Sequence, residues 1–167
     1  MEKKAFKKIL FKAAFCTMAC DGHIDPKEID ELKAINKGTS YFRGVDLSQE
    51  LHTLVQEVNQ TGIKAIKKLF ENLKNLDLNS LQELLILEVV LRIIYADKII
   101  DENEIKFLNL IRSYLKIHDE EIYERFGKIE ILHMNEYLEE ININIIEKLK
   151  LPNKDNLESI KIEISKN

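Results

Sequence analysis

Apolar residues recur along most of the chain at the three- and four-residue spacing of amphipathic helices. The stretch over residues 81–97 is apolar on almost every side, which predicts the central and most buried helix. Glu88 and Arg92 are its only charged interior positions, and we expect them to pair on one exposed stripe. The periodicity predicts an all-α, single-domain bundle of about seven or eight helices, over approximately residues 3–20, 26–37, 47–59, 61–73, 81–97, 102–111, 119–125 and 135–150.

The connections and the C-terminus follow from turn and cap residues. Residues 38–46 form the one long predicted loop, and Ser80 with Glu83 forms an S-x-x-E capping box before the central helix. Residues 128–132 suit either a turn or a short extended piece. In residues 152–167 the alternation of isoleucines suits a strand, but a lone strand has no partner. We therefore expect a loosely held tail after a helical domain of residues 1–151.

One internal match stands out from the helical pattern. Residues 20–29 align without gaps to residues 96–105, so that Asp21 pairs with Asp97 at an offset of 76 residues. The flanking apolar positions keep the same register in both segments. We interpret the match as two copies of one helix, acidic turn, helix unit.

The acids of this repeat have both a structural and a functional interpretation. As structure, Asp25 with Glu28 and Asp101 with Glu104 are capping boxes, and Gly22 can take a positive φ to end the first helix. The caps leave Asp21 and Asp97 unexplained, because an anion at a helix C-terminus opposes the helix dipole. Such a residue suggests a cation or a fixed turn hydrogen bond.

The functional interpretation is a divalent-cation site for Ca²⁺, Mg²⁺ or Mn²⁺. The string D-G-x-I-D-x-x-E matches the second half of an EF-hand loop, which ends in its bidentate Glu. The first half is absent, so a competent site requires both turns to converge. Lys98 replaces the glycine in the second copy, and we expect the first copy to bind more tightly. The candidate ligands are Asp21, Asp25, Glu28, Asp97, Asp101 and Glu104.

The segment from Ala19 to Glu28 resembles the signature of the TerB-like family, an Ala-Asp-Gly-x-Ile-Asp-x-x-Glu pattern that closes a helix pair. The segment from Tyr95 to Glu104 is similar to the same pattern. The resemblance covers roughly the first two-thirds of the chain. It implies an all-helical fold, an acidic metal-binding surface and a link to tellurite resistance and related stress or envelope systems.

Composition narrows the function further. The net charge of −4 argues against a nucleic-acid partner, and the most apolar run, interrupted by Glu88 and Arg92, argues against an integral membrane segment. Cys16 and Cys20 sit four residues apart, where a disulfide is rare, and a reducing cytoplasm is the simplest location. With His23 they could form a thiol and imidazole cluster, although packing is the favoured role.

The sequence contains no phosphate-binding loop and no nucleophile or zinc-hydrolase motif, so we expect no enzyme. The leading hypothesis is a non-enzymatic, cytoplasmic TerB-like protein that presents its acidic turns to a divalent cation or a protein partner. The alternative is a purely structural helical interaction module in which the acids act only as helix caps.

Overall fold

The computed structural model describes residues 3–97, 99–132 and 151–165, and these residues contain eight α-helices and no β-strand. The all-α prediction is therefore confirmed, while the helix predicted over residues 135–150 lies outside the described residues. The helices are α1 (Lys3–Ala19), α2 (Pro26–Gly38), α3 (Leu47–Thr61), α4 (Lys64–Asn75), α5 (Ser80–Ala96), α6 (Glu102–Tyr114), α7 (Asp119–Phe126) and α9 (Lys154–Ser165).

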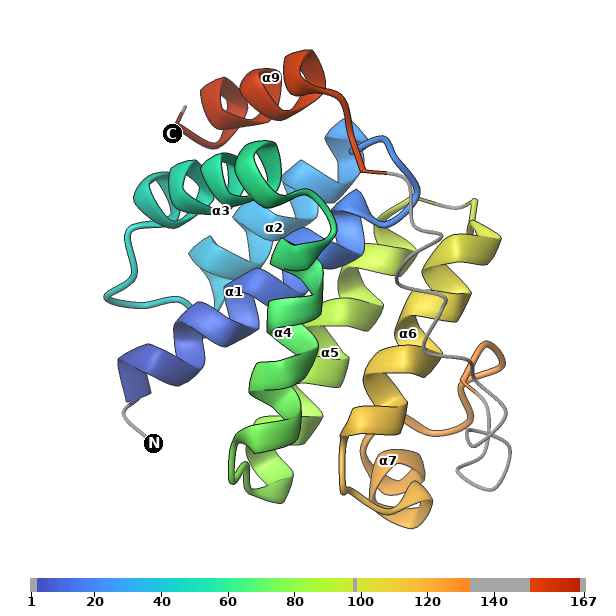
Figure 1. Cartoon of the computed structure of the whole chain (residues 1–167). Helices are drawn as coiled ribbons and strands as arrows, with labels where there is room; N and C mark the ends of the chain where they lie inside the picture. Colours follow the sequence, from blue (N-terminus) through green and yellow to red (C-terminus); the bar gives the residue numbers. More distant parts are fainter. Residues whose placement is uncertain (1–2, 98, 133–150, 166–167) are drawn as a thin grey trace.

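Helix α5 occupies the centre, as its apolar sequence predicts. It packs against α1, α2 and α6 (Figure 1), so its side chains are covered from several directions. Val89, Val90, Ile93 and Ile94 have no exposed surface at all. Because a buried aliphatic side chain contributes roughly 1.5–3 kcal/mol, this helix is a main source of stability.

The N-terminus of α5 differs by one residue from the prediction. Asn79, rather than Ser80, is the N-cap: its side chain accepts from the Gln82 N–H at 2.9 Å, and Gln82 accepts in return from the Asn79 N–H at 3.0 Å. Asn caps a helix as well as Ser does, so both registers satisfy the local rule. With the capping box formed by Asn79 and Gln82, the Glu83 side chain is not needed as a cap and is available for contacts with a distant segment.

The polar stripe of α5 also makes longer-range contacts than expected. Glu88 and Arg92 do not pair with each other. Arg92 Nε lies 2.7 Å from Glu31 Oε1 on α2, and Glu88 Oε1 lies 2.9 Å from Arg125 Nη2 on α7. The predicted pairing within α5 is wrong because α2 and α7 bring opposite charges close to each side chain, so that the stripe lies under neighbouring elements.

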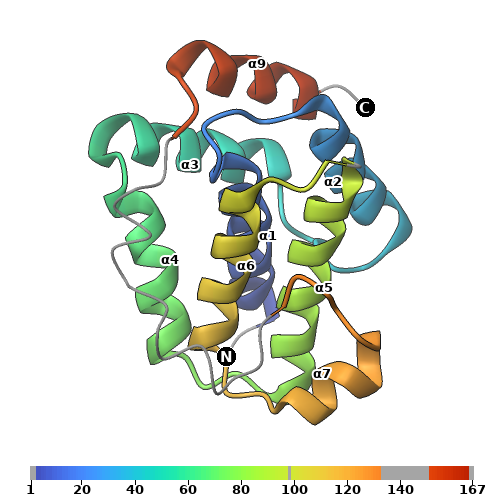
Figure 2. The ribbon, with the colours of Figure 1, turned by 90° about the vertical axis from the view of Figure 1, so that its right-hand side faces the viewer.

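The C-terminal residues are the largest departure from the prediction. They form helix α9, which lies across α3 and α2 (Figures 1 and 2) and is not a loose tail. Leu157, Ile160 and Ile164 are buried at the spacing of a helical face, while Ile162 is 60% exposed. The alternating isoleucines suggested a strand instead of a helix. The buried helical face begins at Leu157, which is not one of these isoleucines.

Two of the described connections can be compared with the sequence prediction. Residues 39–46 form a loop, one residue shorter than predicted, and its Phe42 ring packs edge-on against Phe11 with the ring centroids 5.9 Å apart. Residues 129–132 form a turn, closed by a hydrogen bond from the Leu132 N–H to the Ile129 carbonyl. Among the helices described, none is long and apolar enough to cross a membrane.

Candidate functional site

The two acidic turns, α1 to α2 and α5 to α6, lie at the same end of the bundle (Figure 2). Helix α2 begins at Pro26 and ends at Gly38, and α6 begins at Glu102 and ends at Tyr114, so both boundaries keep the 76-residue offset of the sequence match. The helices before the turns end at Ala19 and Ala96, within one residue of that offset. The turns therefore occupy corresponding places in the chain and neighbouring places in space.

Both predicted capping boxes are present. The Asp25 side chain accepts from the Lys27 N–H at 2.8 Å, and Glu28 accepts from the Asp25 N–H at 2.8 Å. In the second turn the Asp101 side chain accepts from the Asn103 N–H at 2.7 Å, and Glu104 Oε2 accepts from the Asp101 N–H at 3.2 Å. These bonds fix the start of α2 and of α6.

Asp21 and Asp97 lie outside the capping boxes, and each accepts a hydrogen bond from a backbone N–H of its own turn. Asp21 Oδ1 accepts from the His23 N–H at 3.0 Å, and Asp97 Oδ1 accepts from the Ile99 N–H at 3.3 Å. Each is a side-chain turn of the kind that Asp and Asn form two residues ahead of themselves. Gly22 has a φ of 87°, as predicted for the residue that ends the first helix. The turn hydrogen bond is thus one reason for an acid at these positions.

The two glutamates of the capping boxes meet. The side chains of Glu28 and Glu104 lie close enough for each to act electrostatically on the other, and the two residues are only 3% and 5% exposed. Because two buried carboxylates repel, this arrangement favours a proton on at least one of them. The turns therefore converge through their glutamates, as a shared site requires.

Burial and negative neighbours set the proton affinity of this pair. Burial first, and then the charges of Glu104 and Asp21, together raise the pKa of Glu28 to about 9, although the hydrogen bond from the Asp25 N–H acts in the opposite direction. Burial likewise raises the pKa of Glu104 to about 7, with Asp21 and Asp101 acting in the same direction. The pKa of Asp21 is also raised, first by burial. The end of the bundle that holds the two turns thus brings several carboxyl groups together, and bound protons neutralise part of their negative charge.

Positive charge reaches only the rim of this cluster in the described part of the chain. Lys27 Nζ lies 3.8 Å from Asp97 Oδ1, which links the first turn to the second, and the Lys27 side chain is 64% exposed. Neither Glu28 nor Glu104 forms a salt bridge with a described Lys or Arg. Lys98, expected to weaken the second copy, lies outside the described residues.

The six predicted ligands are brought to one end but are not assembled into a finished metal site. Among the described residues, no group of three His, Cys, Asp or Glu side chains is arranged to hold an ion. Asp25 and Asp101 direct one oxygen to their own helices, and the glutamates each give one oxygen to a backbone N–H. The remaining carboxyl oxygens of the two turns are the ones that an ion could take.

The cysteines near the first turn are packing residues. Cys16 and Cys20 are 2% and 0% exposed, and the Cys20 thiol donates to the Thr17 carbonyl at 3.0 Å. Burial raises the pKa of the Cys16 thiol to about 12, so it stays protonated and is a poor metal ligand. Both cysteines thus pack in the core, as the favoured interpretation predicts.

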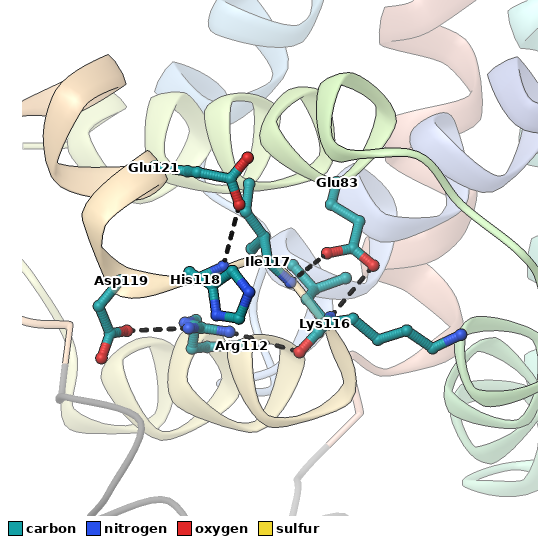
Figure 3. A network of polar contacts seen from close by, with 8 residues as sticks. Glu83, Arg112, Lys116, Ile117, His118, Asp119 and Glu121 are labelled. Atoms are coloured by element: carbon teal, nitrogen blue, oxygen red, sulfur yellow. Dashed lines mark hydrogen bonds and ion pairs between the residues drawn. The ribbon is translucent and has the colours of Figure 1, made fainter.

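A second buried polar cluster, at the opposite end of α5 and α6, was not predicted (Figure 3). The Glu83 carboxylate accepts from the Lys116 N–H at 3.1 Å and the Ile117 N–H at 2.7 Å. Arg112, with no exposed surface, donates to Asp119 at 2.8 Å. The only signal for this cluster in the sequence was one charged residue, Glu83 on α5 and Arg112 on α6, within each otherwise apolar helical face. This cluster fixes the connection from α6 to α7.

The comparisons with known proteins agree with the family pattern of the acidic turns. A profile of the family described as tellurite resistance protein TerB matches residues 10–125, well over half of the chain. Neither the curated proteins nor the solved structures give a significant match. The matched residues include both acidic turns and the helices α2 to α6, and we conclude that this chain belongs to the TerB family of tellurite resistance proteins.

Proposed function

We propose that this protein is a non-enzymatic member of its family whose two acidic turns together bind one divalent cation. We further infer that the turns are copies of one duplicated unit, because their caps and turn bonds correspond residue by residue and their helix boundaries correspond to within one residue. The single observation that carries the cation proposal is that two buried glutamates, Glu28 from the first turn and Glu104 from the second, lie close enough to act electrostatically on each other.

The physical argument starts from the proton on this pair. A buried carboxyl pair with raised pKa values must retain a proton near neutral pH or receive a cation in its place. Hard divalent ions such as Ca²⁺, Mg²⁺ and Mn²⁺ bind carboxylate oxygens, and binding then releases the proton. Asp21 and Asp101 lie close enough to act electrostatically on Glu104, which supports them as further ligands of the same ion.

Titration calorimetry with Ca²⁺, Mg²⁺, Mn²⁺ and Zn²⁺ tests the proposal on the full chain. We expect saturable binding of at least one of the first three ions, tighter at pH 8 than at pH 6, and at least about tenfold weaker in Glu28→Gln. Glu102→Gln is the matched control, because Glu102 starts α6 but its side chain is 81% exposed and pairs with Lys106. Its affinity should equal that of the wild type.

The second candidate function is a helical interaction module in which the acids act only as caps. The turn bonds of Asp21 and Asp97 favour it, since they give these residues a structural reason. If no ion produces binding heat or raises the melting temperature, this candidate takes the place of the first. For both candidate functions we propose a protein partner. We also propose no catalytic role, because the sequence contains no motif of a nucleophile with its base.

A further inference from the structure

Consecutive backbone N–H groups of the first acidic turn each donate to an acceptor. Three of them find it within the turn and its flanking helices: the Gly22 N–H donates to the Ala19 carbonyl at 3.2 Å, the His23 N–H to Asp21 Oδ1 at 3.0 Å and the Asp25 N–H to Glu28 Oε2 at 2.8 Å. The Ile24 N–H is the exception. Its acceptor is Asn156 Oδ1 on α9, at 3.1 Å and 132 residues further along the chain.

The Ile24 N–H depends on this acceptor because of its surroundings. Ile24 is only 2% exposed, and a buried N–H without an acceptor costs free energy. The second turn provides the comparison, since Ile100, the counterpart of Ile24, is more exposed and its N–H has no acceptor among the described residues. The Asn156 oxygen thus completes the hydrogen bonds of the first turn and not those of the second.

Helix α9 holds the Asn156 side chain beside the first turn (Figures 1 and 2). The Asn156 N–H donates to Asn153 Oδ1 at 2.8 Å, which fixes the start of the helix. The side chains of Leu157 and Ile160 are buried, and α9 packs on α3 and α2. The TerB profile ends at residue 125, so Asn156 supports the turn from outside the matched domain.

The bond from Ile24 fixes the backbone between two candidate ligands, Asp21 and Asp25. A metal ion binds more tightly to ligands that are already held in place, because ordering them on binding costs free energy. Without the Asn156 oxygen, the Ile24 N–H would have to turn towards water to find an acceptor. That rotation of the peptide group would move the carboxyl groups on either side of it.

We propose that Asn156 is a positioning residue of the cation site, which holds the first acidic turn in the conformation that binds the ion. Its side-chain oxygen acts through the Ile24 N–H, and Asn156 itself is not a ligand. This inference rests on the proposed function, because the turn that Asn156 supports is one half of the proposed site. Helix α9 is thereby part of the functional end of the molecule.

Calorimetry with Mn²⁺ on the full chain tests the role of Asn156. We expect Asn156→Ala to bind Mn²⁺ about tenfold more weakly than the wild type, as is common when a residue that orients a metal ligand is removed. Asn156→Asp keeps an oxygen that accepts from the Ile24 N–H, so its affinity should be at least that of the wild type. The matched control is Asn153→Ala, which removes an acceptor at the start of α9 but keeps the Asn156 oxygen. Its affinity should stay close to that of the wild type.

Hydrogen exchange measured by NMR in chelator separates this inference from the proposed function. We expect the Ile24 amide to exchange faster in Asn156→Ala than in the wild type and in Asn153→Ala. Unchanged Mn²⁺ affinity in folded Asn156→Ala, or equal losses in both alanine variants, would overturn the inference while the cation site stands. If the wild type binds no ion, the proposed function fails, and unchanged exchange of Ile24 would overturn the positioning role as well.

Discussion

The two ends of the helix pair formed by α5 and α6 bury charge in opposite ways. At one end Arg112 meets Asp119, and Glu83 meets two backbone N–H groups, so each charge faces a partner that favours it. At the other end Glu28 meets Glu104, an arrangement that costs free energy unless a proton or cation intervenes. The balanced cluster is explained by the fold alone. The unbalanced cluster is where a bound cation would reduce this cost, as the proposed function requires.

The largest expected effect is the pH dependence of stability without divalent ions. The pKa values of Glu28 and Glu104, about 9 and about 7, lie above the ordinary value, so the folded state holds protons that the unfolded state releases. Their contribution is complete below about pH 4.5 and is lost as pH rises through 7 for Glu104 and 9 for Glu28. Each such proton lowers the free energy of unfolding by up to about 1.4 kcal/mol per pH unit.

Urea unfolding of wild type and Glu28→Gln in chelator from pH 5 to pH 8 measures this effect. The glutamine keeps the hydrogen bonds of a protonated Glu28, and we expect the variant to gain stability relative to the wild type as pH rises. Parallel curves for the two proteins would show that Glu28 carries its charge without cost. The contrast between the two ends would then disappear.

Breaking the balanced end should give the next largest effect. Arg112→Met removes the buried guanidinium and its ion pair with Asp119, and we expect a loss of about 3 kcal/mol. This is the low end for a buried pair because the Asp119 side chain is 35% exposed. Lys106→Met, which breaks an exposed pair with Glu102, should cost less than about 1 kcal/mol. Equal losses in urea unfolding would contradict the structural role of Arg112.

A substitution with a smaller expected effect distinguishes the role of Asp25 as a helix cap from a role as a cation ligand. Asp25→Ala removes the N-cap of α2 and should lower the free energy of unfolding by about 1 kcal/mol with or without divalent ions. Thermal unfolding in chelator and in Mn²⁺ provides the comparison. A loss that appears only when Mn²⁺ is present would make Asp25 a ligand first and a cap second.

The smallest expected change in chelator is that of Asp21→Asn. The amide oxygen can still accept from the His23 N–H, and the substitution removes an anion from the end of α1. We expect a gain of a few tenths of a kcal/mol in chelator and no rise in melting temperature on adding Mn²⁺. If Mn²⁺ stabilises the variant as much as the wild type, Asp21 serves only the turn.

Local patterns in the sequence account for most of the fold and for half of the site. Helix starts at Pro26 and Glu102 follow from capping boxes, which depend on residues three apart, and the burial of α5 follows from its composition. Contacts between distant residues were beyond this reasoning. The meeting of Glu28 with Glu104 depends on how two helix pairs pack. The position of α9 depends on an apolar surface shared by α2 and α3, and on the hydrogen bond that the Ile24 N–H donates to Asn156 Oδ1.

Counting the protons released on cation binding tests the central claim most directly. Calorimetry with Mn²⁺ at pH 7, in two buffers of different ionisation enthalpy, gives that number for wild type and Glu28→Gln. The account predicts release of up to about one proton by the wild type, and weaker binding with less release by the variant. Saturable binding with the same affinity and no proton release in both proteins would place the ion elsewhere and contradict the account.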